Sequence, residues 1–88
     1  MKEGQSVLGV ICACYDQFFE AEKKIADCIM ERKEEVVEMT VAELAAASKT
    51  SDATVSRFCR RCGFKSFQSL KLALAKEVME ESQKAVQV

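Results

Sequence analysis

Basic and hydroxyl side chains gather in one short stretch near the middle of the chain. The cations of this stretch are Arg57, Arg60, Arg61 and Lys65, and serines and threonines lie among them. Guanidinium and ammonium groups neutralise phosphates, and an arginine can also donate two hydrogen bonds to the edge of a guanine. Side chains of these types at this spacing indicate contact with the backbone and the bases of a nucleic acid.

The charge of the chain is unevenly distributed. The 88 residues carry a formal net charge of −1, but residues 40–76 hold seven Lys/Arg against two Asp/Glu, a net +5. Residues 1–39 hold five against nine, a net −4, and residues 77–88 hold one against three, a net −2. A basic segment between two acidic ones is the electrostatic footprint of a phosphate-binding surface.

Two short helices must position these side chains. Leu44 and Ala45 mark the inner face of the first helix, and Val55 and Phe58 mark that of the second, with the polar residues 49–51 between them. Two helices joined by three or four residues form a helix-turn-helix, whose second helix enters the major groove of DNA. The sequence therefore predicts a helix-turn-helix over residues 40–74 that reads double-stranded DNA.

Capping residues support the boundaries of both helices. Thr40 and Glu43 form a T-x-x-E capping box, and Ser51 or Asp52 can cap the second helix. Gly63 follows the last periodic residue, where a left-handed conformation costs glycine least. Lys49 stands where such turns commonly place glycine, so we expect a strained or differently shaped turn there.

The expected DNA contacts form two groups. Base edges should be reached from the outward N-terminal part of the second helix, by Ser51, Asp52, Ala53, Ser56 and Arg57. Phosphates, which position a protein without specifying sequence, should be met by Thr40, Thr54, Arg60, Arg61, Lys65 and Ser66. A carboxylate near DNA is repelled unless it accepts from a cytosine amine, so the safer role for Asp52 is helix capping.

The remaining apolar residues also follow helical spacing. Two stripes cover residues 7–15 and 18–36, and a third helix is expected to open at Ser66. The apolar residues of that third helix are Phe67, Leu70, Leu74 and Val78. The chain has no proline and no strand-like alternation of useful length. These patterns predict an all-α fold, a single bundle of five or six helices with a homeodomain-like helix-turn-helix.

The five cysteines fit reduced thiols that pack as small hydrophobic residues. Their number is odd, most lie on apolar helical faces, and the chain has no histidine to complete a zinc site. The alternative is the C-x-x-C pair of Cys59 and Cys62, which could bind a metal or change redox state. One isolated pair is weak evidence, so we expect no metal and no cofactor.

The stretch from Leu44 to Lys71, LAAASKTSDATVSRFCRRCGFKSFQSLK, closely resembles the N-terminal helix-turn-helix domain of RpiR-type bacterial transcriptional regulators. The matching core runs from Thr54 to Cys59 and continues through Gly63-Phe64, Phe67 and Leu70-Lys71. A weaker similarity covers EKKIADCI over residues 22–29. The resemblance implies a regulator of genes for sugar or sugar-phosphate metabolism.

The resemblance also implies an organisation and a set of partners. Family members carry, after this domain, a sugar-isomerase-type domain that binds a phosphosugar and controls dimer geometry. We therefore expect the DNA-binding domain over residues 1–79, and a helix end or the start of a linker to such a domain over residues 80–88. The expected partners are double-stranded DNA and a second copy in a homodimer, with a phosphosugar effector acting only through the further domain.

Two other classes of function compete with DNA binding. A protein-interaction or dimerisation module would use the acidic first half, and exposure of Ile11, Tyr15, Phe18 or Phe19 would mark its surface. An enzyme has little support, because no histidine, glycine-rich phosphate loop or convergent carboxylate pair is visible and no residue is a candidate for catalysis.

The sequence also bears on location. No apolar run approaches the roughly 20 residues of a membrane span, and the N-terminus lacks the apolar core of a secretory signal. We expect a cytoplasmic protein that does not contact a membrane.

Overall fold

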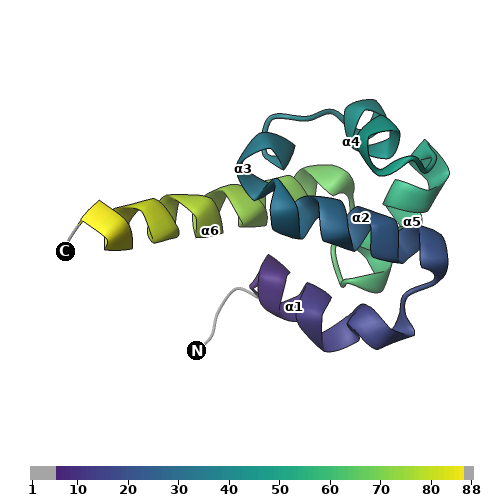
Figure 1. Ribbon diagram of the computed structural model, residues 1–88, viewed down its shortest axis with the longest axis horizontal. Helices are drawn as coiled ribbons and strands as arrows, with labels where there is room; N and C mark the ends of the chain where they lie inside the picture. Colours follow the sequence, from purple (N-terminus) through teal and green to yellow (C-terminus); the bar gives the residue numbers. More distant parts are fainter. Residues whose placement is uncertain (1–5, 87–88) are drawn as a thin grey trace.

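The computed structural model describes residues 6–86, with side chains through residue 80. Within that range the chain forms six α-helices and one 3-10 helix (Figure 1). Their bounds are α1 Val7–Cys14, η1 Tyr15–Gln17, α2 Glu20–Glu31, α3 Lys33–Val36, α4 Val41–Ser48, α5 Asp52–Arg61 and α6 Phe67–Val86. The expected all-α bundle with a helix-turn-helix is confirmed.

Helix α2 forms the centre of the core. It crosses the middle of the helical body, with α1 below it and α3 and α4 above it in Figure 1, and it contacts α3, α4 and α5. Ile25, Ala26 and Ile29 on α2 are fully buried. Phe58 of α5 is also fully buried, with its ring centroid 5.0 Å from that of Phe18. Helix α5 therefore rests on the core through an aromatic side chain that is completely removed from water.

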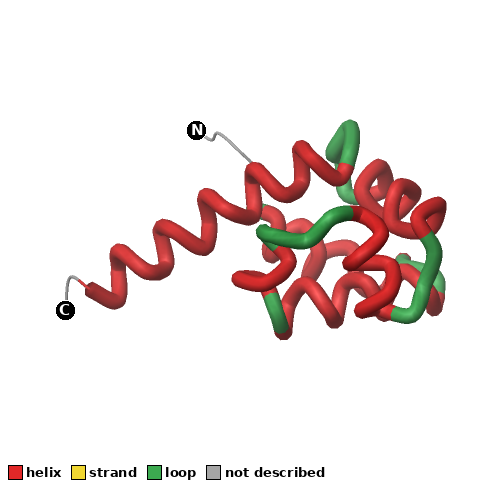
Figure 2. Tube along the Cα trace, turned by 90° about the horizontal axis from the view of Figure 1, so that it is seen from above, coloured by secondary structure: helices red, strands yellow, loops and turns green. Residues whose placement is uncertain are grey.

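Helix α6 packs against α1, α3 and α5 with its N-terminal part. Leu70 and Leu74 are fully buried there, as their spacing predicts. The C-terminal part of α6 extends beyond the other helices in both views (Figures 1 and 2). The segment 80–88, expected to end a helix or begin a linker, is helical as far as Val86, and residues 87–88 lie outside the described range.

The first half of the chain departs from its expected stripes at two places. Val36 does not continue the face of α2, because that helix ends at Glu31 and the short helix α3 carries Val36 into the core. Cys12 lies within the expected apolar stripe of residues 7–15 but is exposed, whereas Val7 and Ile11 are fully buried. A helix of eight residues buries only a narrow face against one neighbour, so adjacent apolar positions divide between core and solvent.

Helix α1 is fastened to α6 by one carboxylate. Glu77 accepts hydrogen bonds from the backbone N–H groups of Val7 and Leu8, and Ser6 caps the same helix end by accepting from Gly9 N at 3.0 Å. Free N–H groups at a helix start carry partial positive charge and favour an anion. The contact joins residues that are 70 positions apart in sequence.

The turn of the helix-turn-helix is left-handed at Lys49, as its position suggested. Lys49 has φ 60° and ψ 44°, and the N–H groups of Lys49 and Thr50 donate to the carbonyls of Ala46 and Ala45 at 3.1 and 2.8 Å. This pair of bonds is the Schellman motif, and Gly63, with φ 95°, ends α5 in the same way. The turn has standard geometry, and a lysine occupies its glycine position.

We expect Lys49→Gly to be neutral or to stabilise the domain by up to about 1 kcal/mol. Glycine removes the steric cost of a left-handed Cβ, and its greater freedom in the unfolded chain offsets part of that gain. Urea denaturation followed by circular dichroism measures the change. Lys65→Gly, at an exposed residue outside any helix, shows the effect of a glycine that relieves no positive φ. A clear loss of stability in Lys49→Gly would show that the lysine side chain itself holds the turn.

Candidate nucleic-acid interface

Capping hydrogen bonds determine where the two helices of the motif begin. At the start of α4, Thr40 N donates to Glu43 Oε1 at 2.9 Å and Glu43 N donates to Thr40 Oγ1 at 3.1 Å, which confirms the capping box. At the start of α5, Ser51 Oγ accepts from Thr54 N at 3.2 Å, so Ser51 is the cap and Asp52 is the first helical residue. Asp52 is exposed, and its charge favours this helix end.

Helix α5 has one buried face and one exposed face. Val55, Phe58 and Cys59 point into the core. The exposed residues of the helix include Asp52, Ala53, Ser56, Arg57 and Arg60. Positions 53, 56, 57 and 60 recur at spacings of three and four and therefore lie on one side of the helix. The expected base-contacting residues are brought together on this side, with Ser51 at its N-terminal end.

The other expected contacts lie at the ends of the motif. Thr40 at the start of α4 and Lys65 and Ser66 at the start of α6 are exposed. Thr54 is half-buried, with its hydroxyl 2.9 Å from Ser51 Oγ. These residues lie at the beginnings and ends of helices, where exposed side chains can reach a nucleic-acid backbone on either side of a groove.

Three exposed cations of the motif lack an acidic partner among the described residues. Arg57, Arg60 and Lys65 form no ion pair with any residue in the described part of the chain. A cation already paired within its own protein must lose that partner before it neutralises a phosphate. These three side chains need no such exchange.

Arg61 differs from its neighbours. Its Nε lies 2.9 and 3.1 Å from the two carboxylate oxygens of Glu22, and its guanidinium lies over the ring of Phe19, 5.0 Å from the centroid. The Arg61 side chain, which was expected to contact phosphate, thus points toward α2. The assignment of Arg61 to DNA stays a prediction, and an internal partner already occupies its Nε–H.

Lys71 has a role that the sequence did not suggest. Its Nζ donates to the carbonyl oxygen of Met39 at 2.8 Å and lies 5.3 Å from the ring centroid of Phe67. Met39 immediately precedes the cap of α4, so this contact ties the start of the motif to α6. The lysine is one of the residues that carry the resemblance, but spacing alone does not identify a partner 32 positions away.

Comparison with known proteins assigns the family. The family described as "Helix-turn-helix domain, rpiR family" matches residues 5–81. The chain belongs to the RpiR family. The resemblance carried by residues 44–71 is therefore confirmed, and the match extends over both the helix-turn-helix and the supporting helices α1 and α2.

Several relatives of this RpiR-family domain are transcriptional regulators. It is 42% identical over 78 residues to an uncharacterised HTH-type regulator of Caldanaerobacter subterraneus, covering 89% of this chain and 28% of that protein. It is 32% identical over 74 residues to the HTH-type transcriptional regulator HexR of Pseudomonas aeruginosa, covering 84% and 26%. The chain thus spans little more than a quarter of the length of these relatives.

A solved structure agrees with the fold. The RpiR-family domain superposes with a TM-score of 0.78 on the N-terminal domain of YbbH, an uncharacterised HTH-type transcriptional regulator from Bacillus subtilis. The two chains are 35% identical, and the superposition covers 82% of this chain and 88% of the other. The chain is an HTH transcriptional-regulator domain and not a catalytic domain.

The C-x-x-C pair is buried in this RpiR-family domain. Burial raises the pKa of the Cys59 thiol to about 12 and that of Cys62 to about 11. Thiolates, and not thiols, bind metals and attack disulfides. Within residues 6–80, no three His, Cys, Asp or Glu side chains gather as a metal site would require. Both cysteines pack as core residues.

We expect these two thiols to resist labelling in the folded domain. At pH 8 an alkylating reagent should modify exposed Cys12 readily, whereas Cys59 and Cys62 should react only after unfolding, because both pKa values lie well above that pH. Mass spectrometry of peptides from native and urea-unfolded protein measures the difference. Labelling of Cys59 at the rate of Cys12, or zinc co-purifying at one equivalent, would contradict this account.

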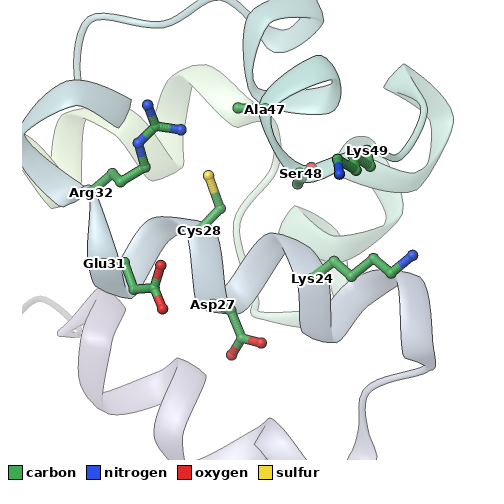
Figure 3. A pocket seen from close by; sticks show the side chains of 8 residues that line it. All are labelled: Lys24, Asp27, Cys28, Glu31, Arg32, Ala47, Ser48 and Lys49. Atoms are coloured by element: carbon green, nitrogen blue, oxygen red, sulfur yellow. The ribbon is translucent and has the colours of Figure 1, made fainter.

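A pocket of about 270 Å³ lies between α2 and α4 (Figure 3). Its lining residues are Lys24, Asp27, Cys28, Glu31, Arg32, Ala47, Ser48 and Lys49. Two of its charged residues have partners outside the pocket: Asp27 accepts from the Tyr15 hydroxyl at 2.9 Å, and Arg32 pairs with Glu35 at 2.8 Å. Figure 3 shows Asp27 pointing away from α4. The pocket lacks a convergent set of polar groups for a small ligand.

One further property concerns membranes. Among the helices of residues 6–86, none combines the length and the apolar character that crossing a bilayer requires.

Proposed function

We propose that this RpiR-family domain binds double-stranded DNA by inserting α5 into the major groove. The observation that carries the proposal is the exposed side of α5, where Ala53, Ser56, Arg57 and Arg60 stand together opposite a fully buried Val55 and Phe58. An α-helix of this size fits a groove about 12 Å wide, and small residues beside an arginine allow close approach to base edges.

Within that proposal the two groups of contacts have different tasks. Ser51, Asp52, Ala53, Ser56 and Arg57 lie at or near the N-terminal end of α5, the end that reads bases in helix-turn-helix proteins. Thr40, Thr54, Arg60, Lys65 and Ser66 are assigned to phosphates. Asp52 contributes mainly through its charge at the helix start and contacts a base only where a cytosine amine is presented.

Selection from a pool of randomised duplexes tests the proposal. The domain should enrich one short motif and should bind the enriched duplex at least about 1,000-fold more tightly than a scrambled duplex at the same salt concentration. Arg57→Ala serves as the matched variant, because it should remove enrichment at one base pair while leaving the fold intact. Failure to enrich any motif, with the domain shown to be folded, would contradict sequence-specific binding.

We propose further that a regulator containing this domain acts as a homodimer on genes of sugar or sugar-phosphate metabolism. One helix-turn-helix reads one half-site, and two copies held about one helical turn apart read a two-fold operator. Membership of the RpiR family supports this proposal. A phosphosugar would act through a further domain, so sugar phosphates added to this chain alone should leave its DNA affinity unchanged.

A protein-interaction module is less well supported. Ile11 is fully buried and Phe18 is 5% exposed, so two of the four residues that would mark such a surface belong to the core. Tyr15 is half-buried and bonded to Asp27. Phe19 is exposed, and the Arg61 guanidinium lies over its ring. These residues offer no continuous apolar face for a partner.

A further inference from the structure

Glu22 is a charged residue that the proposed function leaves without a task. It lies in the first turn of α2 and is only 2% exposed. A carboxylate removed from water is costly unless hydrogen bonds and an opposite charge replace the lost hydration. Glu22 receives both: Phe19 N donates to its Oε1 at 2.9 Å, and Arg61 Nε lies 2.9 and 3.1 Å from its two oxygens.

The partner of Glu22 is the last residue of α5. The Arg61 side chain is 37% exposed, and its guanidinium also lies over the Phe19 ring, at 5.0 Å from the centroid. Because Phe19 precedes α2 and Glu22 lies in its first turn, the two contacts of Arg61, with the Glu22 carboxylate and the Phe19 ring, join the C-terminal end of α5 to the start of α2. We call Phe19, Glu22 and Arg61 the α2–α5 strut.

The strut acts at the opposite end of α5 from the proposed base contacts. Helix α5 has 10 residues, so it is roughly 15 Å long at 1.5 Å per residue. A tilt of about 10° around its C-terminal end would displace the other end by roughly 2.5 Å. Hydrogen bonds tolerate only a few tenths of an ångström before they weaken, so such a tilt would break contacts with base edges.

We propose that Glu22 and Arg61 are positioning residues that set the angle of the recognition helix, and that Arg61 contributes to sequence discrimination without contacting phosphate. This inference rests on the proposed function. It separates Arg61 from Arg60, which is its neighbour in sequence and has no acidic partner in the described part of the chain. Arg60 neutralises a phosphate of the DNA, whereas Arg61 holds α5 at the angle that base contacts require.

The test compares Arg61→Met, Arg60→Met and Glu22→Gln on the enriched duplex and on a scrambled duplex across a range of salt concentrations. A plot of log K against log salt has a negative slope. Arg60→Met should reduce the magnitude of that slope by about 0.9, which corresponds to the loss of one phosphate contact. Arg61→Met should leave that slope unchanged and should lower the ratio of specific to scrambled affinity at least about fivefold, the loss of one base contact. Glu22→Gln should lower the ratio similarly, although it removes no cation.

Two further variants isolate the strut. Arg61→Lys keeps the charge and one donor for Glu22, so it should restore most of the ratio. The double variant Glu22→Gln/Arg61→Met should lose no more than either single variant, because both remove the same contact. Thermal unfolding followed by circular dichroism identifies a temperature at which every variant is folded, and all binding is measured there.

The opposite outcome is equally distinct. If Arg61 contacts phosphate, Arg61→Met lowers the slope by about 0.9 with the ratio unchanged, and Glu22→Gln tightens binding to every duplex by releasing the guanidinium. That result would overturn the inference and leave the proposed function intact. If the parent domain binds no duplex, the proposed function fails, and with it the role in discrimination. If Glu22→Gln does not fold, the slope and ratio of Arg61→Met alone still decide the inference.

Discussion

Phe58→Ala is expected to lower the free energy of unfolding by about 3–5 kcal/mol. Phe58 is fully buried on α5, and its ring lies 5.0 Å from that of Phe18. Alanine would leave a cavity between α5 and the core that these short helices cannot close without moving. Because small domains have only about 5–15 kcal/mol of stability, the variant should be largely unfolded in moderate urea.

Leu72→Ala is the matched control. Leu72 on α6 is 67% exposed, so its truncation should change the unfolding free energy by less than about 0.5 kcal/mol. Urea titrations of the parent and both variants give the comparison directly. If Phe58→Ala lowers the free energy of unfolding by less than about 1 kcal/mol, the packing of α5 against the core does not depend on this side chain.

Arg57→Ala should weaken binding to the enriched duplex by about 1–3 kcal/mol and relax the preference at one base pair. Arg57 is exposed on α5 and forms no ion pair with the described residues, so no internal contact is lost with it. Fluorescence anisotropy with enriched and scrambled duplexes measures both effects.

Arg60→Ala and Lys65→Ala provide the contrast. Each should weaken binding to all duplexes by similar factors and lower the salt slope, because a phosphate contact is independent of sequence. Equal losses on enriched and scrambled DNA for all three variants would make Arg57 a phosphate ligand as well. Base reading would then belong to Ser51, Ala53 or Ser56.

Features set by neighbours in sequence were predictable. The capping box of Thr40 and Glu43 joins residues one helical turn apart, and the left-handed Lys49 and Gly63 follow from where each helix stops. Helical periodicity likewise predicted the buried face of α5, because burial on one side leaves a pattern of three and four residues. These signals were sufficient to predict the fold class and the helix-turn-helix.

Contacts between distant segments were not predictable from spacing. Glu22 meets Arg61 across 39 positions, Lys71 meets Met39 across 32, and Glu77 meets Val7 across 70. Charge counts treat each of these residues as solvated, so Arg61 was grouped with Arg57 and Arg60 as a DNA ligand. The packing of α2, α5 and α6 shows which charged side chains form hydrogen bonds or ion pairs within the domain.

Nuclear magnetic resonance offers the most direct test of the central claim, that the exposed side of α5 meets DNA. The enriched duplex would be titrated into ¹⁵N-labelled domain, with a scrambled duplex at the same salt concentration as the control. With the enriched duplex, the largest changes in amide chemical shift should fall on Ser51 to Arg57, with smaller changes at Thr40 and Lys65. The scrambled duplex should change mainly the shifts of Thr40 and Lys65. Changes centred on α1 or on the C-terminal part of α6, with α5 unaffected, would contradict the account.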